Sequence, residues 1–535
     1  MRKLLTVISL FLFLQDADSQ ENLPTDFLSP AFHKGRRDAF RKLMPANSVA
    51  LIFAYPERVF SRDVNYVYHQ NPDLHYLSGY DEPNSVLILF KEMQGTGDSA
   101  YNEVFFVRER HPTQEIWTGR RHGVDGTRQK LGFTKVYTGD RFNNFAIEFS
   151  RFSTILYDKI PVDVPDDGSG YDLAGLIRSF KEKAKIKPRN ETLVTLKNAI
   201  RDYATPNSLP RIIDYYKMED LAKSDPVIGN DPIVKQVLNK PDTAQLAAII
   251  KTLVTSKDGI DQYDDLLNTL RETKTPEELA LIRKAAWISA QGHAEVMRAV
   301  APSMGEREAE GIHRYIHAKH GAEQEGYPPI VGAGANGCIL HYEENNATKI
   351  NNQLLLMDVA CEYHGYSADV TRTIPANGKF SPEQKAIYEI VYEAQDSAIL
   401  AIHDGVEFPA LSRIASRVLT RGLQRLGIIK DKSELVQYYP HGLGHHIGLD
   451  VHDRSPYGTL KKDMVITIEP GIYIPAGSKC DPKWWNIGVR IEDDILITAT
   501  GYENLSVAAP RKWQEIEKMI AAKSMFEQAA KPVAK

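Results

Sequence analysis

The sequence has few cysteines, little excess charge and no apolar run long enough to cross a membrane. Its 535 residues include three cysteines, a number too small and odd for a disulfide framework, so we expect packing roles for these thiols. The net charge of −5 gives no overall positive potential that would attract a polyanion, so nucleic acid is not an expected partner. The apolar share of 42% is ordinary for a soluble protein, and the length predicts two or three domains.

The N-terminus departs from this average composition. Arg2 and Lys3 precede an apolar run from Leu4 to Leu14, and small polar residues follow. Such a run is too short for a bilayer, which takes about 17–25 residues. The pattern is typical of a signal peptide over residues 1–19, and a buried first strand or helix is the alternative. We therefore expect an exported protein, periplasmic or extracellular, that has no membrane association after cleavage.

The rest of the chain divides into four segments. Residues 24–175 alternate strand-length apolar runs with amphipathic helical patterns, which predicts an α/β domain. Residues 176–267 repeat charged and apolar residues at helical spacing between prolines, which predicts a helical insertion. Residues 268–510 hold acidic residues inside apolar strand patterns, and residues 511–535 favour a tail helix.

Two helix starts in the third segment are strongly marked. Thr275, Pro276 and Glu278 follow the capping-box pattern, in which side chains satisfy the free N–H groups of the first turn. Ser381 begins the same pattern further along. Helices are therefore predicted to begin next to Thr275 and Ser381.

The segment LLLMDVACEYHGYSADVTRTI predicts a β-hairpin with a tight turn at Tyr363–His364. Asp358 and Asp369 are equidistant from this turn, so they should face each other with Cβ atoms about 4.5–5.5 Å apart. Two carboxylates so placed repel each other unless a divalent cation, or a pair of cations, neutralises them. A solvated hairpin face is the alternative, which the apolar flanks disfavour.

A histidine cluster follows in HGLGHHIGLDVHD, which contains His441, His445, His446 and His452. Imidazole binds zinc, cobalt and manganese, and it donates protons near neutral pH. Four of the chain's sixteen histidines lie in this stretch, which favours a functional cluster. For His446 alone we favour a packed position in the core.

Two further acids, Glu469 and Glu492, lie in apolar strand patterns, with Arg490 on the same strand face as Glu492. A buried acid is costly unless it is paired or metal-bound. The resulting set of four carboxylates and a histidine contains no thiolate, which disfavours a closed structural zinc site. Cys361 should point to the face opposite Asp358, and no G-x-S-x-G motif occurs, so a serine or cysteine nucleophile is not expected.

In chain order, NGCILHY, MDVACEYHGYSADVTRT, HGLGHHIGLDVHD, TIEPGIY and GVRIEDD resemble the pita-bread metallopeptidases, and among them aminopeptidase P most closely. YHQNPDLHYLSGYDEPNSVLIL and EIWTGRRHG resemble that family's N-terminal domain. The resemblance implies an α/β (α+β) fold, in which a creatinase/aminopeptidase P-like domain precedes a C-terminal pita-bread domain. The helical insertion between them is longer than the family leads us to expect, which leaves the preferred peptide length open.

The resemblance also implies a role for individual residues. Asp358, Asp369, His445, Glu469 and Glu492 would hold two divalent ions, with manganese expected first and cobalt or zinc as alternatives. His341 and His452 would act on the substrate carbonyl, and Glu469 would carry a proton to the leaving nitrogen. The residues expected near the substrate are His441, Arg271, Tyr327, Tyr473, Arg490 and Trp117.

The implied reaction is hydrolysis of the bond between an N-terminal residue and a following proline by metal-activated hydroxide. The ligands would be peptides with proline at position two, and a homo-oligomer, dimer or tetramer, is expected. Two alternatives remain. A prolidase would cleave only X-Pro dipeptides, and a non-catalytic pita-bread protein would only bind peptides. The last should lack some metal ligands, yet all five residues are present.

Overall fold

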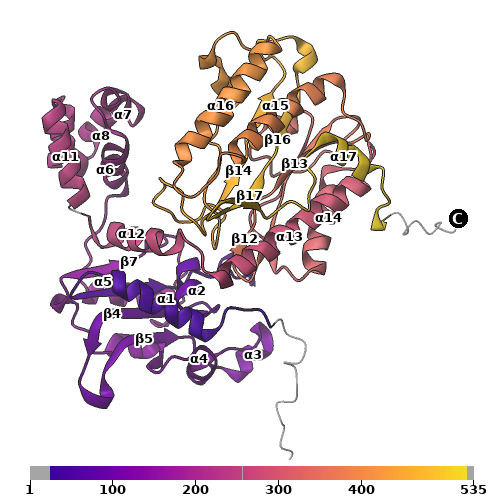
Figure 1. The fold of residues 1–535 in the computed structure, drawn as a ribbon. Coiled ribbons are helices and arrows are strands. Elements are labelled where there is room, and N and C mark those ends of the chain that lie inside the picture. Colours follow the sequence, from indigo (N-terminus) through magenta and orange to yellow (C-terminus); the bar gives the residue numbers. More distant parts are fainter. Residues whose placement is uncertain (1–24, 256, 527–535) are drawn as a thin grey trace, which may run out of the picture.

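The structure, a computed structural model, describes residues 25–255 and 257–526, so the predicted signal peptide lies outside the described residues. An N-terminal α/β domain, a helical module and a larger C-terminal domain follow one another along the chain (Figure 1). Among the described residues, no helix has the length and hydropathy needed to cross a membrane. The three cysteines form no disulfide; Cys361 is buried and the other two are half-buried.

The N-terminal domain is built on a five-stranded sheet in the order β6-β5-β4-β1-β7. The strands are β1 (Ser48–Phe53), β4 (Val86–Gln94), β5 (Tyr101–Val107), β6 (Val136–Thr138) and β7 (Thr154–Tyr157), and β2 (Val59–Ser61) and β3 (Val64–Asn65) form a separate hairpin. Every residue of β1 is buried, because helices cover both faces of the sheet. These helices include α1 (Pro30–Leu43), α2 (Pro72–Ser78), α4 (Gly123–Leu131) and α5 (Leu173–Lys183), whereas α3 (Pro112–Thr118) buries none of its residues.

The helical module consists of six short helices with a core of their own. They are α6 (Glu191–Tyr203), α7 (Leu209–Tyr215), α8 (Met218–Ser224), α9 (Pro226–Asn230), α10 (Pro232–Leu238) and α11 (Thr243–Thr255). The Asp-Pro pairs that interrupt the helical pattern are helix starts. The carboxylates of Asp225 and Asp231 accept hydrogen bonds from the first N–H groups of α9 and α10.

The predicted insertion, residues 176–267, is wider than this module at both ends. The boundary at 175/176 falls inside α5, whose Phe180 packs against Phe53 of the N-terminal sheet with ring centroids 5.6 Å apart. Helix α12 (Gly259–Arg271) likewise packs Tyr263 against Phe40 of α1. Helical periodicity predicts a helix but does not say which core its apolar face will join.

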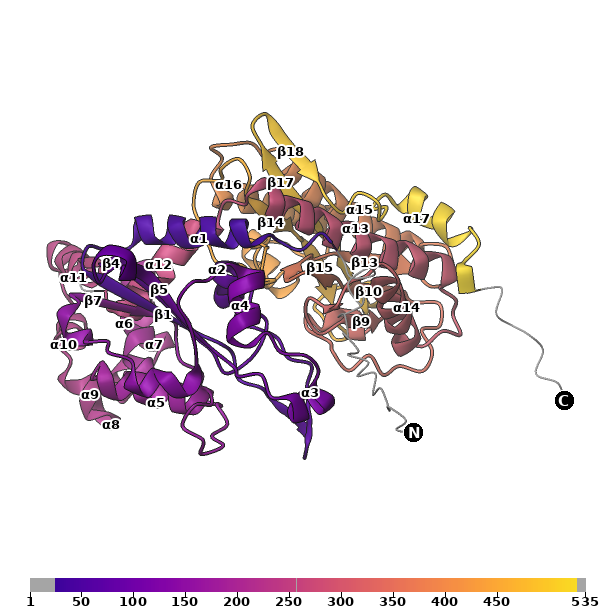
Figure 2. The same ribbon diagram turned by 90° about the horizontal axis from the view of Figure 1, so that it is seen from below.

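The C-terminal domain places helices around small antiparallel sheets (Figures 1 and 2). Its helices are α13 (Pro276–Ala299), α14 (Glu306–Lys319), α15 (Pro382–Ile399), α16 (Phe408–Arg425) and, in the tail, α17 (Trp513–Ile520). Both predicted capping boxes are present, at Thr275 before α13 and at Ser381 before α15. The outer helices bury their apolar faces against the strands in one continuous core.

Four sheets of this domain position the polar residues described below. Their strand orders are β13-β10-β9, β12-β11-β8, β14-β17-β18 and β15-β16. The strands are β8 (Gln324–Glu325), β9 (Ile330–Ala333), β10 (Leu354–Asp358), β11 (Cys361–Tyr363), β12 (Tyr366–Ser367), β13 (Thr371–Pro375), β14 (Val465–Ile468), β15 (Gly471–Ile474), β16 (Ile487–Arg490), β17 (Asp493–Thr498) and β18 (Gly501–Asn504).

The predicted hairpin is present, but its register differs by two residues. Tyr363 pairs with Tyr366, so the turn is His364–Gly365, and both residues have positive φ as a two-residue type I′ turn requires. Asp358 therefore faces Thr371 and not Asp369, which makes the two aspartates diagonal neighbours. A shift of two residues preserves the face on which each side chain lies, so the prediction of a shared face survives the wrong register.

Candidate metal centre

Three predicted ligands converge at the centre of the C-terminal domain. Single ligand atoms of Asp369, His445 and Glu492 lie within 4.8 Å of one another. Asp369 lies between β12 and β13, and Glu492 lies between β16 and β17. His445 lies in a loop, and its carbonyl accepts a hydrogen bond from Thr467 of β14. His445 Nε2 is 3.3 Å from the Asp369 carboxylate and 3.7 Å from that of Glu469.

Asp358 joins this group through shared hydrogen bonds. The Tyr327 hydroxyl is 2.5 Å from an oxygen of Asp358 and 2.7 Å from one of Asp369. The Arg490 guanidinium donates to the other Asp358 oxygen at 2.7 Å and to the Tyr473 hydroxyl at 2.9 Å. The structure therefore brings all five expected ligands, together with Tyr327 and Arg490, into one buried site.

The ring of His445 is oriented by a bond on its outer side. Its Nδ1 donates to the carbonyl of His446 at 3.0 Å, which leaves Nε2 facing Asp369 and Glu469. An outer carbonyl of this kind is the usual partner of a metal-binding histidine. His446 itself is buried, in agreement with the core position favoured for it.

The electrostatics of the site are those of crowded buried acids. Burial, reinforced by the other carboxylates, raises the pKa of Glu469 to about 7 and the pKa values of Asp369 and Glu492 above their usual range. Burial alone would lower the pKa of His445, but the hydrogen bond to Asp369 and the charge of Glu469 raise it to about 9. Crowding of this kind is relieved when a cation binds between the acids.

The donor set fits divalent metal ions. The Oε1 atom of Glu492 is buried and has no hydrogen-bond partner among the described residues, while Oε2 accepts a bond from Thr371 at 2.7 Å. Carboxylate oxygens with one imidazole suit manganese, cobalt and zinc, and the absence of thiolate among these donors separates the site from structural zinc centres.

Three further histidines lie beside these acids. The ring centroid of His452 is 4.3 Å from that of His445. His441 donates from Nδ1 to the Gly442 carbonyl and accepts from the Tyr473 hydroxyl at Nε2, and burial lowers its pKa to about 4. Burial also lowers the pKa of His452, and the exposed His341 lies near both His441 and His452.

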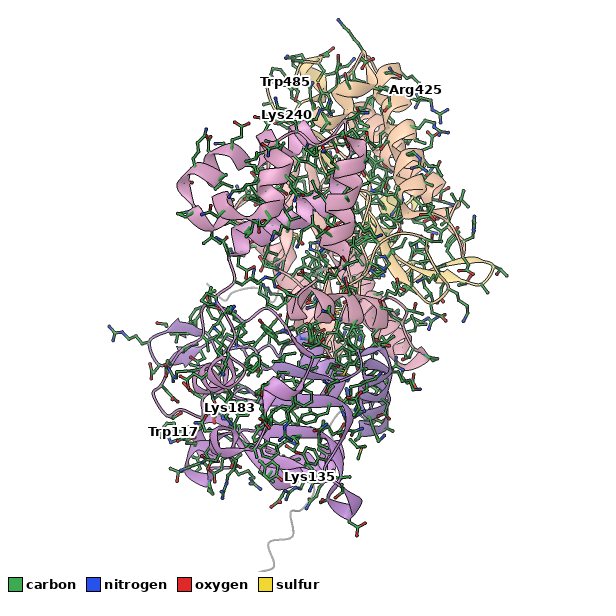
Figure 3. All side chains as sticks on the ribbon, turned by 90° about the vertical axis from the view of Figure 1, so that its left-hand side faces the viewer. Trp117, Lys135, Lys183, Lys240, Arg425 and Trp485 are labelled. Carbon is green, nitrogen blue, oxygen red and sulfur yellow. The ribbon has the colours of Figure 1, made fainter. Side chains whose placement is uncertain are left out.

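Two expected substrate residues lie elsewhere in this chain. Arg271 is buried and binds Asp73 at 2.6 Å, Asp450 at 2.8 Å and also Asp453, so its guanidinium joins the domains together. Trp117 lies on α3 of the N-terminal domain with 85% of its surface exposed (Figure 3). Sequence matching found both positions but could not show what surrounds them.

Two supporting residues were missed by the sequence analysis. Thr371 holds Glu492 through its hydroxyl, and the carboxylate of Asp494 accepts the backbone N–H of Asp369 at 3.1 Å. Each lies two residues from a predicted ligand and therefore on the same strand face. That periodicity is the signal that could have identified them.

Comparisons with known proteins agree with this geometry. The family model described as metallopeptidase family M24 matches residues 280–499, and the model described as the N-terminal domain of aminopeptidase P matches residues 33–155. The chain is 34% identical to the Xaa-Pro aminopeptidase of Escherichia coli, over 91% of this chain and 97% of that protein. It is 26% identical to human Xaa-Pro aminopeptidase 3, over 89% and 82% of the two chains.

Solved structures give the same relationship in three dimensions. Aminopeptidase P from E. coli with the inhibitor Pro-Leu superposes with a TM-score of 0.70 at 31% identity, over 92% of this chain and 98% of that one. The aminopeptidase of Pseudomonas aeruginosa superposes with a TM-score of 0.71 at the same identity and coverage.

Proposed function

The chain belongs to the aminopeptidase P group of metallopeptidase family M24, and on this premise we propose that it removes the N-terminal residue from peptides whose second residue is proline. The predictions of the family, the mixed α/β fold and a metallo-aminopeptidase are confirmed. The observation that carries the function is the convergence of Asp369, His445 and Glu492 in a domain that matches the metallopeptidase model.

We propose two divalent ions at this centre, with manganese as the first candidate. Asp358, Asp369, His445, Glu469 and Glu492 would hold them. Bound ions would supply Lewis acidity and lower the pKa of an attacking water. A solved E. coli aminopeptidase P is described as zinc-substituted, so cobalt and zinc are the alternatives to test.

Glu469 is proposed to move the proton during the reaction. Its pKa of about 7 without metal suits a group that takes a proton from water and passes it to the leaving nitrogen. His341 and His452 stand at the edge of the site and are proposed to donate hydrogen bonds to the carbonyl oxygen as negative charge develops there.

The preference for proline is proposed to come from the wall beside His441. Neutral His441 packs between Tyr439 and Tyr473, with ring centroids 4.8 Å and 5.5 Å away. Arg490 fixes the Tyr473 hydroxyl from the other side. Such an aromatic wall suits the apolar face of a pyrrolidine ring. The prolidase alternative is not favoured by the relatives, which are named Xaa-Pro aminopeptidases.

A homo-oligomer, dimer or tetramer, is also proposed. Exposed apolar side chains lie on the β2–β3 hairpin, the segment after it and α3, and isolated soluble domains rarely leave such groups open. They are Val59, Phe60, Val64, Tyr66, Val67, Ile116 and Trp117.

Light scattering measures the mass of the protein in solution. The mass of a single chain would reject the proposal of a homo-oligomer.

Export is proposed from the first residues alone. The basic pair, the short apolar run and the small residues after it support cleavage near Gln20. N-terminal sequencing of the protein recovered outside the cytoplasm should begin near that residue. An intact Met1 terminus on cytoplasmic protein would reject the proposal.

The function is tested with metal-free protein and two substrates. Manganese, cobalt or zinc is added back in the presence of an X-Pro-Y tripeptide or an X-Pro dipeptide. Release of X from the tripeptide, restored by metal and abolished in Asp369→Ala, is the expected result. Cleavage of the dipeptide alone would indicate a prolidase, and bound metal without cleavage of either peptide would contradict catalysis.

A further inference from the structure

Three buried imidazoles lie together in the C-terminal domain, apart from the residues described above. His293 is on α13, and His313 and His317 are one helical turn apart on α14, with exposed fractions of 0%, 0% and 2%. The ring centroid of His313 is 4.6 Å from that of His293 and 5.8 Å from that of His317.

The inner nitrogens of this cluster have no partners. Nδ1 of His293, both ring nitrogens of His313 and Nε2 of His317 are buried without a hydrogen bond to any described residue. Burial of unpaired polar atoms costs free energy, so native structures seldom leave several of them in one place. A species bound between the three rings would supply partners for these nitrogens.

The outer nitrogens, in contrast, are fixed. Nε2 of His293 lies 3.0 Å from the carbonyl of Val359 and 2.9 Å from that of Val370, so it carries the proton and Nδ1 presents a lone pair. Nδ1 of His317 lies 2.8 Å from the carboxylate of Glu325, so Nε2 presents the lone pair there. A backbone carbonyl or a carboxylate behind the ring is the arrangement that orients histidines toward a metal ion.

Space between the rings is kept open by Gly292. A Cβ atom at this position would lie 2.7 Å from Nδ1 of His313 and 3.1 Å from Nε2 of His317. The same point therefore faces a nitrogen of each of these two rings, and any larger residue at this position of α13 would obstruct it.

We propose that His293, His313 and His317 form a second metal site that binds one divalent transition-metal ion of the zinc class. Imidazole donors suit zinc, cobalt, nickel and copper, whereas manganese and magnesium prefer oxygen. Burial lowers the pKa of His293 to about 3 and that of His313 well below its usual value, so both rings are neutral, as ligands must be.

Binding requires the three rings to move closer together. Among the described residues, only Asp369, His445 and Glu492 have ligand atoms within 4.8 Å of one another, so the three imidazoles are not yet at ligand spacing. The ring of His313 has no hydrogen bond to any described residue that would be lost when it turns. His293 donates to the carbonyls of Val359 and Val370, which are the chain neighbours of Asp358 and Asp369. An ion bound to His293 would therefore stabilise the hairpin that carries these two aspartates.

The test removes the first centre and keeps the second. The full chain carrying Asp369→Asn and Glu492→Gln is freed of metal and titrated with Co²⁺, and bound cobalt is measured by elemental analysis and visible absorption. We expect one bound equivalent that is lost on adding His313→Gln or His317→Gln. The matched control is His320→Gln, just beyond the same helix, whose half-buried ring meets Trp287 edge-on, and this change should leave the equivalent unchanged.

Absence of bound cobalt in the double variant, or its persistence after His313→Gln, would overturn the site. Because a substitution in the core can prevent folding, a second measurement leaves the cluster intact. X-ray absorption of the double variant with one equivalent of Zn²⁺ should show a shell of imidazole nitrogens. A shell made only of oxygen donors would overturn the proposal, whatever the outcome for peptide cleavage.

Discussion

Glu469 and His445 make the stability of the metal centre depend on pH. Without metal, the pKa of Glu469 is about 7 against 4.5 for the free side chain, and that of His445 is about 9 against 6.5. Both folded-state values are raised, so both groups stabilise the metal-free fold at low pH. This stabilisation is lost as the pH rises through 7 and then 9.

Metal should therefore stabilise the protein more as the pH rises. Below these pKa values, a binding ion must displace a proton from each group. Above them, both groups are already deprotonated and bind the ion without this cost. We expect the rise in Tm on adding Mn²⁺ to grow between about pH 5 and pH 9. Paired melting curves with Mn²⁺ or a chelator check this, and an increment that is constant or falls with pH would contradict it.

Arg490 is expected to matter although it binds no metal. It donates to Asp358 and to the Tyr473 hydroxyl at once, which a lysine ammonium cannot reproduce. Substitutions of groups that orient metal ligands typically cost about 10–100-fold in metal affinity or activity, and we expect Arg490→Lys to fall in this range. Mn²⁺ titration and kcat/KM on X-Pro-Y measure the effect.

The matched control for this change is Arg283→Lys. Arg283 pairs with Glu503 on the surface, where both side chains are more than 40% exposed, so its pair contributes about 0–1 kcal/mol. The control should leave metal affinity and kcat/KM unchanged. Equal behaviour of the two variants would show that Arg490 does not hold the centre.

For single residues, the sequence predicted the strand face on which a side chain lies better than it predicted the residue that the side chain contacts. Alternation along a strand fixes which face a side chain occupies, and that was enough to place Asp358 with Asp369 and to turn Cys361 away from them, toward Ser289 on α13. The register depends on the turn, and Gly365 moved the turn by one residue. The burial of Arg271 depends on contacts between domains, which no local pattern encodes.

Two predictions at the scale of single helices concern the capping boxes of α13 and α15. The hydroxyls of Thr275 and Ser381 each accept the N–H three residues on, and the Glu or Gln there returns a bond to the cap. We expect Thr275→Ala and Ser381→Ala each to lower the free energy of unfolding by about 1 kcal/mol. Urea denaturation of the metal-free protein measures this change.

The control for the caps is Thr420→Ala, which removes a hydroxyl from the interior of α16. This hydroxyl bonds only to a carbonyl of its own helix, so alanine should be neutral or slightly stabilising. If all three variants lost the same free energy, the caps would have no special role.

The positions of helices were easier to predict than the domain on which each helix packs. Proline, Thr and Ser mark the starts of α13 and α15 locally, and the structure begins these helices at the expected residues. By contrast, α5 and α12 share the composition of the helical module but pack on the N-terminal domain. Tertiary contacts decide which domain the apolar face of a helix packs against, and the residue pattern of one helix does not encode these contacts.

At the scale of the whole molecule, a buried ionic network ties the two large domains together. Asp73 of the N-terminal domain binds Arg271 of α12 and Arg454 of the C-terminal domain, and Lys274 binds Asp453. Removing one charged side chain from such a network leaves its partner as an unpaired buried charge. The network runs through α12 and does not involve the helical module.

The helical module should therefore be separable from the rest of the chain. Arg189 at its start lies 3.6 Å from Asp258 and 2.9 Å from Asp261 just past its end, so a short Gly-Ser linker can replace residues 190–256. Its core is closed on itself, and the excision should cost less than about 1 kcal/mol in unfolding free energy of the remainder.

Activity after this excision separates two roles of the module. It stands beside the C-terminal domain, with Lys240 at the same end of the molecule as Trp485 and Arg425 (Figures 1 and 3). It contributes no residue to the metal centre, so kcat/KM on an X-Pro-Y tripeptide and Mn²⁺ binding should be unchanged. A change in KM confined to long peptides would place the module along the path of the substrate. Loss of tripeptide cleavage in a folded, metal-bound protein would instead show that the module supports the active site itself.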